Sequence, residues 1–221
     1  MTESKLERGV TVVIPCKDEA GALPGVLSAI PRDYRVIVVD NGSTDATAAV
    51  ARLAGATVVA EPEPGYGSAV QAGVHAARTE VVAVLDGDGS MDPRELPALV
   101  AELGPDVDMV VGRRRPHRAG AWPWHARLGN QIVAARLRRR YGLAVHDVAA
   151  MRVVHRARLL DLGPLHRRSG YPLELLVAAA HSGWRLVERD ITYRPRTHGE
   201  SKVSGSWRGT VRAAKDFWSV R

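Results

Sequence analysis

The chain has 221 residues, of which 45% are apolar and 25% are charged, so we expect one domain with a sizeable core. No apolar run approaches the roughly 18 residues of a membrane span, and the first residues contain no apolar signal-peptide stretch. Cys16 is the single cysteine, which excludes an internal disulfide and a cysteine-based metal cluster, and we expect a cytoplasmic protein.

Charge is divided unevenly along the chain. Residues 1–112 carry 8 Lys+Arg and 17 Asp+Glu, a net charge of −9, whereas residues 113–221 carry 23 and 7, a net charge of +16. A basic half is typical of proteins that contact nucleic acid, an anionic membrane surface or a phosphorylated substrate. Charge alone does not choose among these partners.

Strands and helices are predicted to alternate regularly up to Gly112. Apolar runs predict strands at 10–15, 34–39, 56–60, 81–85 and 107–111. Helical spacing and helix-start signals predict helices between these strands, at 23–30, 46–53, 68–77 and 93–103. This alternation favours an α/β fold built on a parallel sheet.

Residues 81–93, VVAVLDGDGSMDP, combine an uninterrupted apolar run with an acidic turn. The run is typical of a strand buried on both faces, and the carboxyl end of such a strand is where open α/β sheets bind ligands. Asp86 and Asp88 suit a hard divalent cation, which would take further ligands from water and substrate phosphates. The alternative is an Asp-Gly turn in which Asp92 caps a helix with Pro93 at its first position.

Beyond Gly112 the pattern is less regular. Residues 113–140 contain nine arginines and no acidic residue, with apolar residues roughly at helical spacing. For the individual arginines a solvated helix face is the favoured interpretation, and a surface that faces an anion is the alternative. Further predicted elements are a short strand at 153–154, helices at 157–162 and 172–181, and a strand at 184–189.

The C-terminal residues are expected to form a loop followed by an amphipathic stretch. Residues 192–206 are polar and Gly-rich, which favours a mobile loop. An apolar stripe follows at helical spacing, formed by Trp207, Val211, Ala214 and Trp218. We favour core packing for this stripe over contact with a membrane surface.

Four stretches together resemble the family 2 glycosyltransferases of the GT-A fold, and most of all the polyprenyl (dolichyl) phosphate sugar transferase branch. They are VVIPCKDEA (12–20), VIVVDNGSTD (36–45), VVAVLDGDGSMDP (81–93) and RTHGESK (196–202). The resemblance covers nearly the whole chain. It implies one GT-A domain, a mostly parallel sheet flanked by helices, in which residues 1–112 bind the nucleotide sugar and the basic residues 113–221 face the acceptor.

The resemblance also implies where the donor binds. The base and ribose of the nucleotide would lie among Pro15, Lys17, Glu19 and Asp40. Asp86 and Asp88 would hold Mg²⁺ or Mn²⁺ against the donor diphosphate, because a divalent ion neutralises the charge that develops on this leaving group.

Some of these acidic and basic residues have simpler explanations. Asp40 could cap a helix, which is the role that we favour for Asp45, and Glu19 could lie in a first helical turn. Lys17 could equally be a plain surface lysine.

Basic residues of the second half match family positions that bind phosphate. Arg114 and Arg127 match an arginine after the fifth strand and another on the next helix, although the triplet 113–115 leaves the first of them open. Arg196, Ser201 and Lys202 match an Arg-x-x-Gly-x-Ser-Lys loop that resembles a lid over the diphosphate. A guanidinium binds phosphate oxygens in bidentate fashion, and a closed lid excludes water.

Asp147, together with Asp88, is the candidate catalytic residue. It lies in HDVAAMR (146–152), where relatives read roughly Asp-x-Gly-x-Phe-Arg and this chain departs at Ala149 and Met151. Asp147 would be a general base for an alcohol acceptor and would mainly position groups for a phosphate acceptor. Glu174 is a second candidate acid on the acceptor side, and His146 is expected to be structural.

The leading hypothesis is therefore a metal-dependent, inverting transferase that moves a hexose from a nucleotide diphosphate sugar to a polyprenyl phosphate. With no predicted membrane helix, the protein would contact the inner membrane face peripherally. The alternatives are the same transfer to a soluble metabolite or saccharide and, remotely, a non-catalytic nucleic-acid binder. A nucleotidyltransferase would need a Gly-rich loop where Pro15-Cys16-Lys17 stands. The base, the sugar, the choice of metal and the oligomeric state, including a homo-oligomer, are left open.

Overall fold

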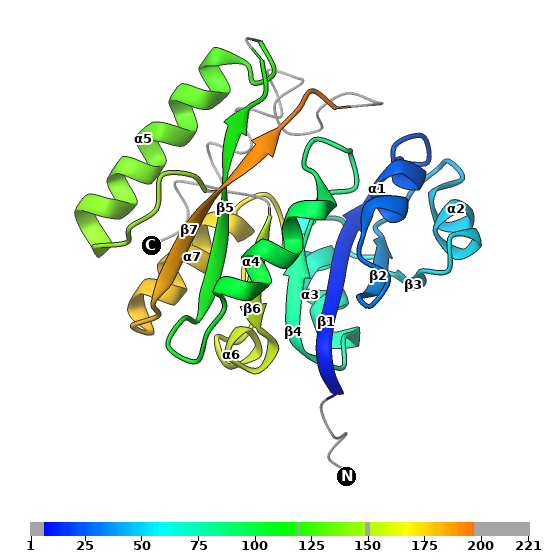
Figure 1. Cartoon of the computed structure of the whole chain (residues 1–221), viewed down its shortest axis with the longest axis horizontal. Helices are drawn as coiled ribbons and strands as arrows, with labels where there is room; N and C mark the ends of the chain where they lie inside the picture. The colour runs from blue at the N-terminus through cyan, green and yellow to red at the C-terminus, as the bar shows by residue number, and fades with distance from the viewer. Residues whose placement is uncertain (1–6, 119, 149–150, 197–221) are drawn as a thin grey trace.

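A seven-stranded sheet forms the centre of the protein in the structure, a computed structural model that describes residues 7–118, 120–148 and 151–196 (Figure 1). The strands are β1 (Glu7–Cys16), β2 (Arg35–Asp40), β3 (Thr57–Ala60), β4 (Thr79–Val84), β5 (Met109–Pro116), β6 (Arg152–His155) and β7 (Leu186–Tyr193). The helices are α1 (Leu23–Ala29), α2 (Thr47–Leu53), α3 (Tyr66–Ala76), the 3₁₀ turn η1 (Pro93–Glu95), α4 (Leu96–Glu102), α5 (Trp124–Tyr141), α6 (Arg156–Asp161) and α7 (Tyr171–His181).

The strand order is β3-β2-β1-β4-β6-β5-β7. Neighbouring strands from β3 to β4 are parallel, β6 runs antiparallel to both β4 and β5, and β5 pairs with β7 in parallel. The expected mostly parallel GT-A-like sheet is thereby confirmed. Strand β6 comes from the basic half of the chain and lies between strands of the acidic half, because it pairs with β4 and with residues 109–111 of β5.

Helices cover both faces of the sheet. Because side chains alternate along a strand, Val13 belongs to one buried cluster with residues of α3, α5, α6 and α7, whereas Val12 and Ile14 belong to another with residues of α1, α2 and α4. The predicted strand at 81–85 is buried as expected, with Leu85 wholly inaccessible. The turn that follows it therefore leaves the core at the middle of the sheet.

Two strands extend well beyond their predicted ends. The strand predicted at 107–111 extends to Pro116, and β7 extends to Tyr193, so the loop predicted from residue 192 begins too early. The extensions form together, because β5 and β7 stay paired from Met109–Leu186 to Pro116–Tyr193. The rest of that loop from residue 197 and the stripe 207–218 lie outside the described residues.

Close packing of α3 on the sheet gives a stability prediction. A Cβ on Gly73 would lie 2.3 Å from Cγ1 of Val13 and 2.9 Å from Cγ2 of Val39. We expect Gly73→Ala to lower the free energy of unfolding in urea by about 1–3 kcal/mol, because overpacking outweighs the gain in helix propensity. The matched control is Gly25→Ala in α1, where nothing lies within 4 Å. That control should be neutral or stabilising, and similar losses in both variants would contradict the prediction.

Candidate active site

Two carboxylates lie in the turn after β4. Gly87 between them is required by close packing, because a Cβ there would lie 2.7 Å from Sγ of Cys16 at the end of β1. Asp88 is 3% exposed, and its Oδ1 accepts a hydrogen bond of 2.9 Å from the Ser90 amide. Asp92 accepts from the Arg94 amide and caps η1, which has Pro93 at its start, as the alternative interpretation predicted for this residue. Capping by Asp92 leaves Asp86 and Asp88 available for a ligand.

Asp86 is held in surroundings that disfavour its charge. Its Oδ1 is buried with no hydrogen-bond partner. Burial, followed by the charge of Asp88, raises the pKa of Asp86 to about 6, although Arg152, Arg196 and Arg114 act in the opposite direction. A divalent cation would satisfy both the buried oxygen and the paired negative charge.

The residues of the turn fit such an ion, but they provide only some of the ligands that it needs. Among the described residues, no three His, Cys, Asp or Glu side chains lie close enough together to hold a metal. Asp86 and Asp88 would therefore contribute two carboxylates, and water and a diphosphate would complete the set, as Mg²⁺ prefers.

Arg196 lies against this acidic turn. Its guanidinium is 3.0 Å from Oδ2 of Asp88 and 3.9 Å from Oε1 of Glu19. The segment after β7 is anchored there, because the Arg194 amide donates to the Ser90 carbonyl at 2.8 Å. Three of the stretches that carried the family resemblance thus meet at one place. Ser201 and Lys202, predicted for the same loop, lie outside the described residues.

The other predicted donor residues lie at the same edge of the sheet. Asp40 ends β2 and is the register partner of Cys16, and its Oδ1 accepts a hydrogen bond of 3.1 Å from the Ser43 amide. Pro15 is half-buried and Lys17 is exposed. Asp45 accepts from the Thr47 amide at 2.9 Å, but it lies one residue before Ala46, the N-cap of α2, so the predicted capping role is met only in part.

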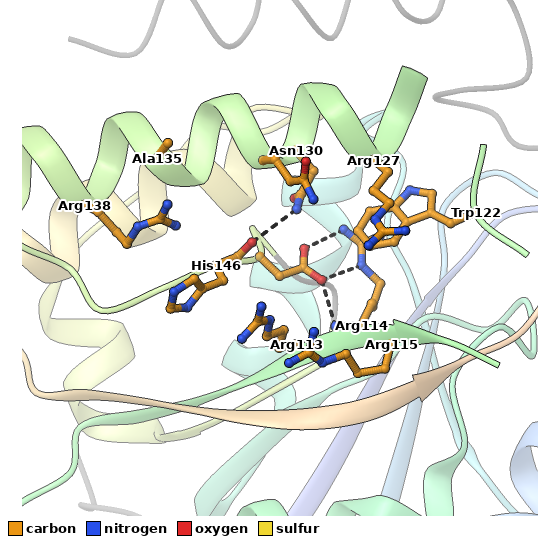
Figure 2. A pocket seen from close by; sticks show the side chains of 11 residues that line it. Arg113, Arg114, Arg115, Trp122, Arg127, Asn130, Ala135, Arg138 and His146 are labelled. Atoms are coloured by element: carbon orange, nitrogen blue, oxygen red, sulfur yellow. Dashed lines mark hydrogen bonds and ion pairs between the residues drawn. The ribbon is translucent and has the colours of Figure 1, made fainter. Parts of the chain in front are cut away.

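An arginine-lined cavity of about 360 Å³ lies between β5, α5 and the segment before β6 (Figure 2). For brevity we call it the arginine pocket. Its lining comprises Arg113, Arg114, Arg115, Trp122, Arg127, Asn130, Gln131, Ala135, Arg138, His146 and Asp147. The expectation of a solvated helix face holds for part of α5 only, because Arg127 and Arg138 face this cavity.

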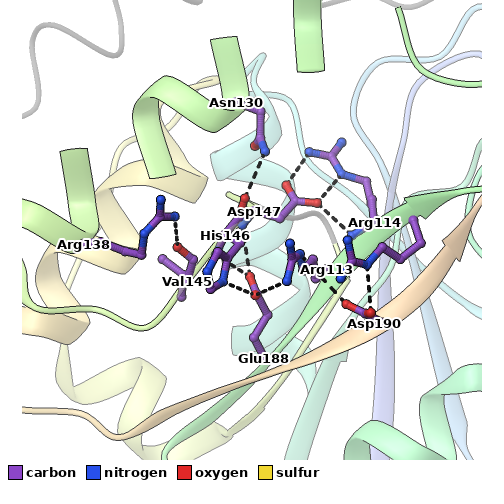
Figure 3. Close-up of polar contacts among 10 residues, drawn as sticks. Arg113, Arg114, Asn130, Arg138, Val145, His146, Asp147, Glu188 and Asp190 are labelled. Atoms are coloured by element: carbon purple, nitrogen blue, oxygen red, sulfur yellow. Dashed lines mark hydrogen bonds and ion pairs between the residues drawn. The ribbon is translucent and has the colours of Figure 1, made fainter. Parts of the chain in front are cut away.

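Asp147 fixes Arg114 in a bidentate pair (Figure 3). The Nε and NH2 atoms of Arg114 donate to the two carboxylate oxygens at 2.9 and 2.7 Å, and the Arg114 amide donates at 2.9 Å. The guanidinium also lies 4.1 Å from the ring centroid of Trp122 and 5.4 Å from that of Tyr193. Burial would lower the pKa of Arg114, but the hydrogen bonds and charge of Asp147 outweigh burial and raise it. Within the triplet Arg114 has the least exposed side chain, 19% against 30% for Arg113 and 50% for Arg115, and it stays the predicted match.

Two acids on β7 neutralise the rest of the triplet. Glu188 accepts from the His146 amide at 2.6 Å, from the Asp147 amide at 3.0 Å and from His146 Nδ1 at 2.8 Å, and it lies 3.9 Å from Arg113 (Figure 3). Asp190 lies 2.8 Å from Nε of Arg115. His146 is therefore structural as expected, and Glu188 holds the backbone that presents Asp147.

Glu174 has a different environment. Its carboxylate accepts a hydrogen bond from the His166 amide, and it is not among the residues that line the arginine pocket. It orders the loop before α7, against which α3 packs so closely that a Cβ on Gly67 would lie 1.9 Å from the His166 carbonyl oxygen. A structural role explains this contact.

Several residues of the site had no predicted role. Tyr66 lies beside Asp86, and burial, followed by the charge of Asp86, raises its pKa, so its hydroxyl stays protonated. Arg152 is 3% exposed, and its Cζ lies 5.8 Å from the ring centroid of Tyr171. A charged residue inside the apolar run MRVV was the available signal for Arg152. Tyr66 and Glu188 had no comparable signal.

Arg114 connects the two sites. It lines the arginine pocket, and its charge also acts on Asp86. Tyr193 is near both: the Arg114 guanidinium lies 5.4 Å from its ring centroid, and burial, with a smaller contribution from Asp88, raises its pKa although Arg114 acts in the opposite direction. The acidic turn and the arginine pocket are thus neighbouring parts of one site.

In the described part of the chain, no helix is long and apolar enough to cross a membrane.

Comparisons with known proteins identify the family and the fold. The profile of Glycosyl transferase family 2 matches residues 11–163. An uncharacterised glycosyltransferase of Mycobacterium tuberculosis is 62% identical over 211 residues, which cover 96% of this chain and 97% of the relative. A dolichyl-phosphate hexose transferase of Haloferax volcanii is 33% identical, with 92% and 90% coverage. Glucosyl-3-phosphoglycerate synthase from M. tuberculosis, solved with Mn²⁺, UDP-glucose and phosphoglyceric acid, shares the fold with a TM-score of 0.77 at 22% identity, over 96% of this chain and 79% of that structure.

The raised pKa of Asp86 predicts a pH-dependent stability. Its pKa rises from 3.8 in ordinary surroundings to about 6, so the folded state binds more protons between these values. The free energy of unfolding should then fall as the pH rises from about 4 to about 6. Asp86→Asn cannot ionise, and we expect it to be more stable than the native protein by up to about 3 kcal/mol near pH 7, with the difference vanishing below about pH 4.

This prediction is checked by urea denaturation with chelator present. The control is Asp161→Asn at an exposed position of α6, which should leave the pH profile unchanged. Parallel profiles for the native protein and the Asp86→Asn variant would show the prediction to be wrong.

Proposed function

The chain belongs to Glycosyl transferase family 2, and on this premise we propose that it moves a hexose from a nucleotide diphosphate sugar to a phosphate-bearing acceptor, for which a polyprenyl phosphate is the favoured candidate. Family membership makes the protein a glycosyltransferase, which removes the non-catalytic nucleic-acid binder as an explanation of its basic half. The observation that carries the proposal is the position of Arg114, between the acidic turn and the arginine pocket.

The acidic turn is proposed to bind the donor diphosphate. A divalent ion held by Asp86 and Asp88 would neutralise the charge that develops on the departing nucleoside diphosphate. Arg196 now lies against Asp88 and Glu19, and in the loaded site its guanidinium would turn to the diphosphate oxygens. Pro15, Lys17 and Asp40 would lie along the nucleoside at the same sheet edge.

The arginine pocket is proposed to bind the acceptor phosphate. Arg127 was assigned to the donor by resemblance, but its place on the wall of this cavity favours the acceptor. A pocket that is rich in guanidinium groups suits a phosphate because each group offers two parallel donors. The relative from Haloferax volcanii, named as a dolichyl-phosphate hexose transferase, supports an acceptor of this kind.

Asp147 is proposed to be a positioning residue. Both of its carboxylate oxygens accept hydrogen bonds from Arg114, so protonation of Asp147 would weaken its ion pair with Arg114. The second pKa of a phosphomonoester is about 6, so an acceptor of this kind is already mostly dianionic at neutral pH and its attack needs little base catalysis. Asp147 would therefore hold Arg114 where both substrates can meet it.

The proposed reaction is a single in-line displacement with inversion. An acceptor phosphate oxygen forms a bond to the anomeric carbon while the bond from that carbon to the donor phosphate oxygen breaks. The electron pair leaves with the nucleoside diphosphate, where Arg196 and the ion would stabilise it. Because the acceptor oxygen carries no proton, none has to be transferred.

The first prediction concerns the acidic turn. We expect the variant Asp86→Ala/Asp88→Ala to remain folded and to lose sugar transfer by at least about 10³-fold, since the leaving-group charge is then unsupported. Release of nucleoside diphosphate with labelled donor and Mn²⁺ measures this loss, and the exposed Asp161→Ala is the control. Undiminished turnover in the double variant, or in excess chelator, would refute the role of the turn.

The second prediction concerns the arginine pocket. We expect Arg127→Gln to raise KM for the acceptor by about tenfold and to leave KM for the donor nearly unchanged, because a charge-assisted hydrogen bond is lost on one substrate. With a water-soluble prenyl phosphate as the acceptor, Arg139→Gln is the matched control, because it lies on the same helix but outside the pocket lining. A change confined to the donor KM would instead return Arg127 to the diphosphate.

The acceptor class is tested by product extraction. Labelled sugar nucleotides are incubated with Mg²⁺ and either a polyprenyl phosphate or a soluble phosphomonoester such as phosphoglyceric acid. We expect butanol-extractable label with the lipid. Label that appears only in the soluble product would support the alternative acceptor at the same pocket.

A further inference from the structure

Helix α5 has a second apolar side that the protein core does not use. Its inward side buries Ala134 and Leu137. On another side Trp124, Leu128 and Ile132 are 76%, 48% and 61% exposed. A helix at the surface of a protein ordinarily has one apolar stripe, directed to the core. Among the described residues, Leu53 is the one other large apolar residue that is exposed to this degree.

The three exposed residues form a continuous stripe beside the arginine pocket. They recur every fourth position, so they follow one another along the helix surface. Since each residue advances about 100° around the helix, the stripe lies between the pocket-lining side with Arg127 and Arg138 and a side with Arg136 and Arg140. Figure 2 shows α5 as one wall of the pocket. Whatever covers the stripe is therefore brought to the rim of the pocket.

The charge around the stripe indicates which kind of partner covers it. Residues 113–140 carry nine arginines and no acidic residue, so a second copy docking through the same stripe would set two strongly cationic helices against each other. The chain's own residues 197–221 include an apolar stripe, but they also contain five Lys+Arg and two Asp+Glu, and this net positive charge disfavours their packing on an arginine-flanked surface. Nucleic acid matches the charge but gives the stripe no apolar surroundings. An anionic bilayer offers both, because its headgroups attract arginine and its acyl boundary accepts Trp, Leu and Ile.

We propose that the stripe Trp124, Leu128 and Ile132, with the flanking arginines of α5, docks the protein on an anionic lipid bilayer and sets the arginine pocket at the level of the lipid phosphates. The purpose of this docking rests on the proposed function, because a polyprenyl phosphate presents its phosphate at that level. Docking itself is a property of α5 and is measured without catalysis.

The test is sedimentation of the full chain with vesicles of phosphatidylglycerol and phosphatidylcholine, and with vesicles of phosphatidylcholine alone. We expect binding to the anionic vesicles that weakens with salt. Trp124→Ser/Ile132→Ser should weaken this binding by about tenfold or more, because two apolar side chains no longer enter the interface. Arg139→Gln/Arg140→Gln should weaken it and flatten its salt dependence.

The control is Leu53→Ser, which removes an apolar side chain that is 89% exposed on α2, at the opposite end of the molecule (Figure 1). It should bind vesicles as the native protein does. Equal binding by the native protein and the Trp124→Ser/Ile132→Ser variant would overturn the proposal. So would a native dimer, or an affinity for a duplex oligonucleotide, that this variant loses.

Activity assays separate this inference from the proposed function. With a short-chain, water-soluble prenyl phosphate, Trp124→Ser/Ile132→Ser should keep native kcat and KM, and its turnover should fall only on a long-chain acceptor in vesicles. Vesicle binding through α5 without transfer to any prenyl phosphate would refute the proposed acceptor and leave docking intact. Transfer to the short-chain acceptor without α5-dependent binding would refute docking alone.

Discussion

The site depends on the balance of charge around two neighbouring carboxylates at the centre of the sheet. Asp86 and Asp88 follow four buried residues, 82–85, so their mutual repulsion acts in surroundings that screen it weakly. Positive charge reaches them from three separate elements, as Arg152 on β6, Arg196 after β7 and Arg114 on β5. These arginines reduce the repulsion without cancelling it, which is why the pKa of Asp86 stays raised. A site in this condition favours a small, highly charged cation.

The same constraint explains how the basic half is organised. Three consecutive arginines would repel one another and the rest of their segment, but each is matched separately. Arg114 is bound by Asp147, and its neighbours are bound by acids on β7. Glu188 in turn holds the backbone amide of Asp147. The arginine pocket therefore keeps a fixed geometry while its net charge stays positive, as a site for a phosphate requires.

In the reaction that we propose, the division of charge along the chain corresponds to two substrates that meet at Arg114. In the proposed reaction the acidic half needs an ion to receive a diphosphate, and the basic half receives a phosphate directly. Helix α5 serves the core, the pocket and an outward surface with three different sides. If that surface lies on a bilayer, the acceptor phosphate enters the pocket without its lipid chain leaving the membrane.

The sequence by itself determined the α/β alternation, the strand buried on both faces and the acidic turn, because apolar periodicity and Asp-Gly turns are local properties. The family resemblance carried by its motifs also implied that Glu19, Asp88 and Arg196 belong to one site. Only the tertiary structure decided that Asp147 is bound to Arg114, that β5 and β7 extend each other, and that Tyr66, Arg152 and Glu188 belong to the site. Those partners lie on elements far apart in the chain, and which strand inserts beside which is set by packing across the whole sheet. Local residue patterns carry no record of that packing.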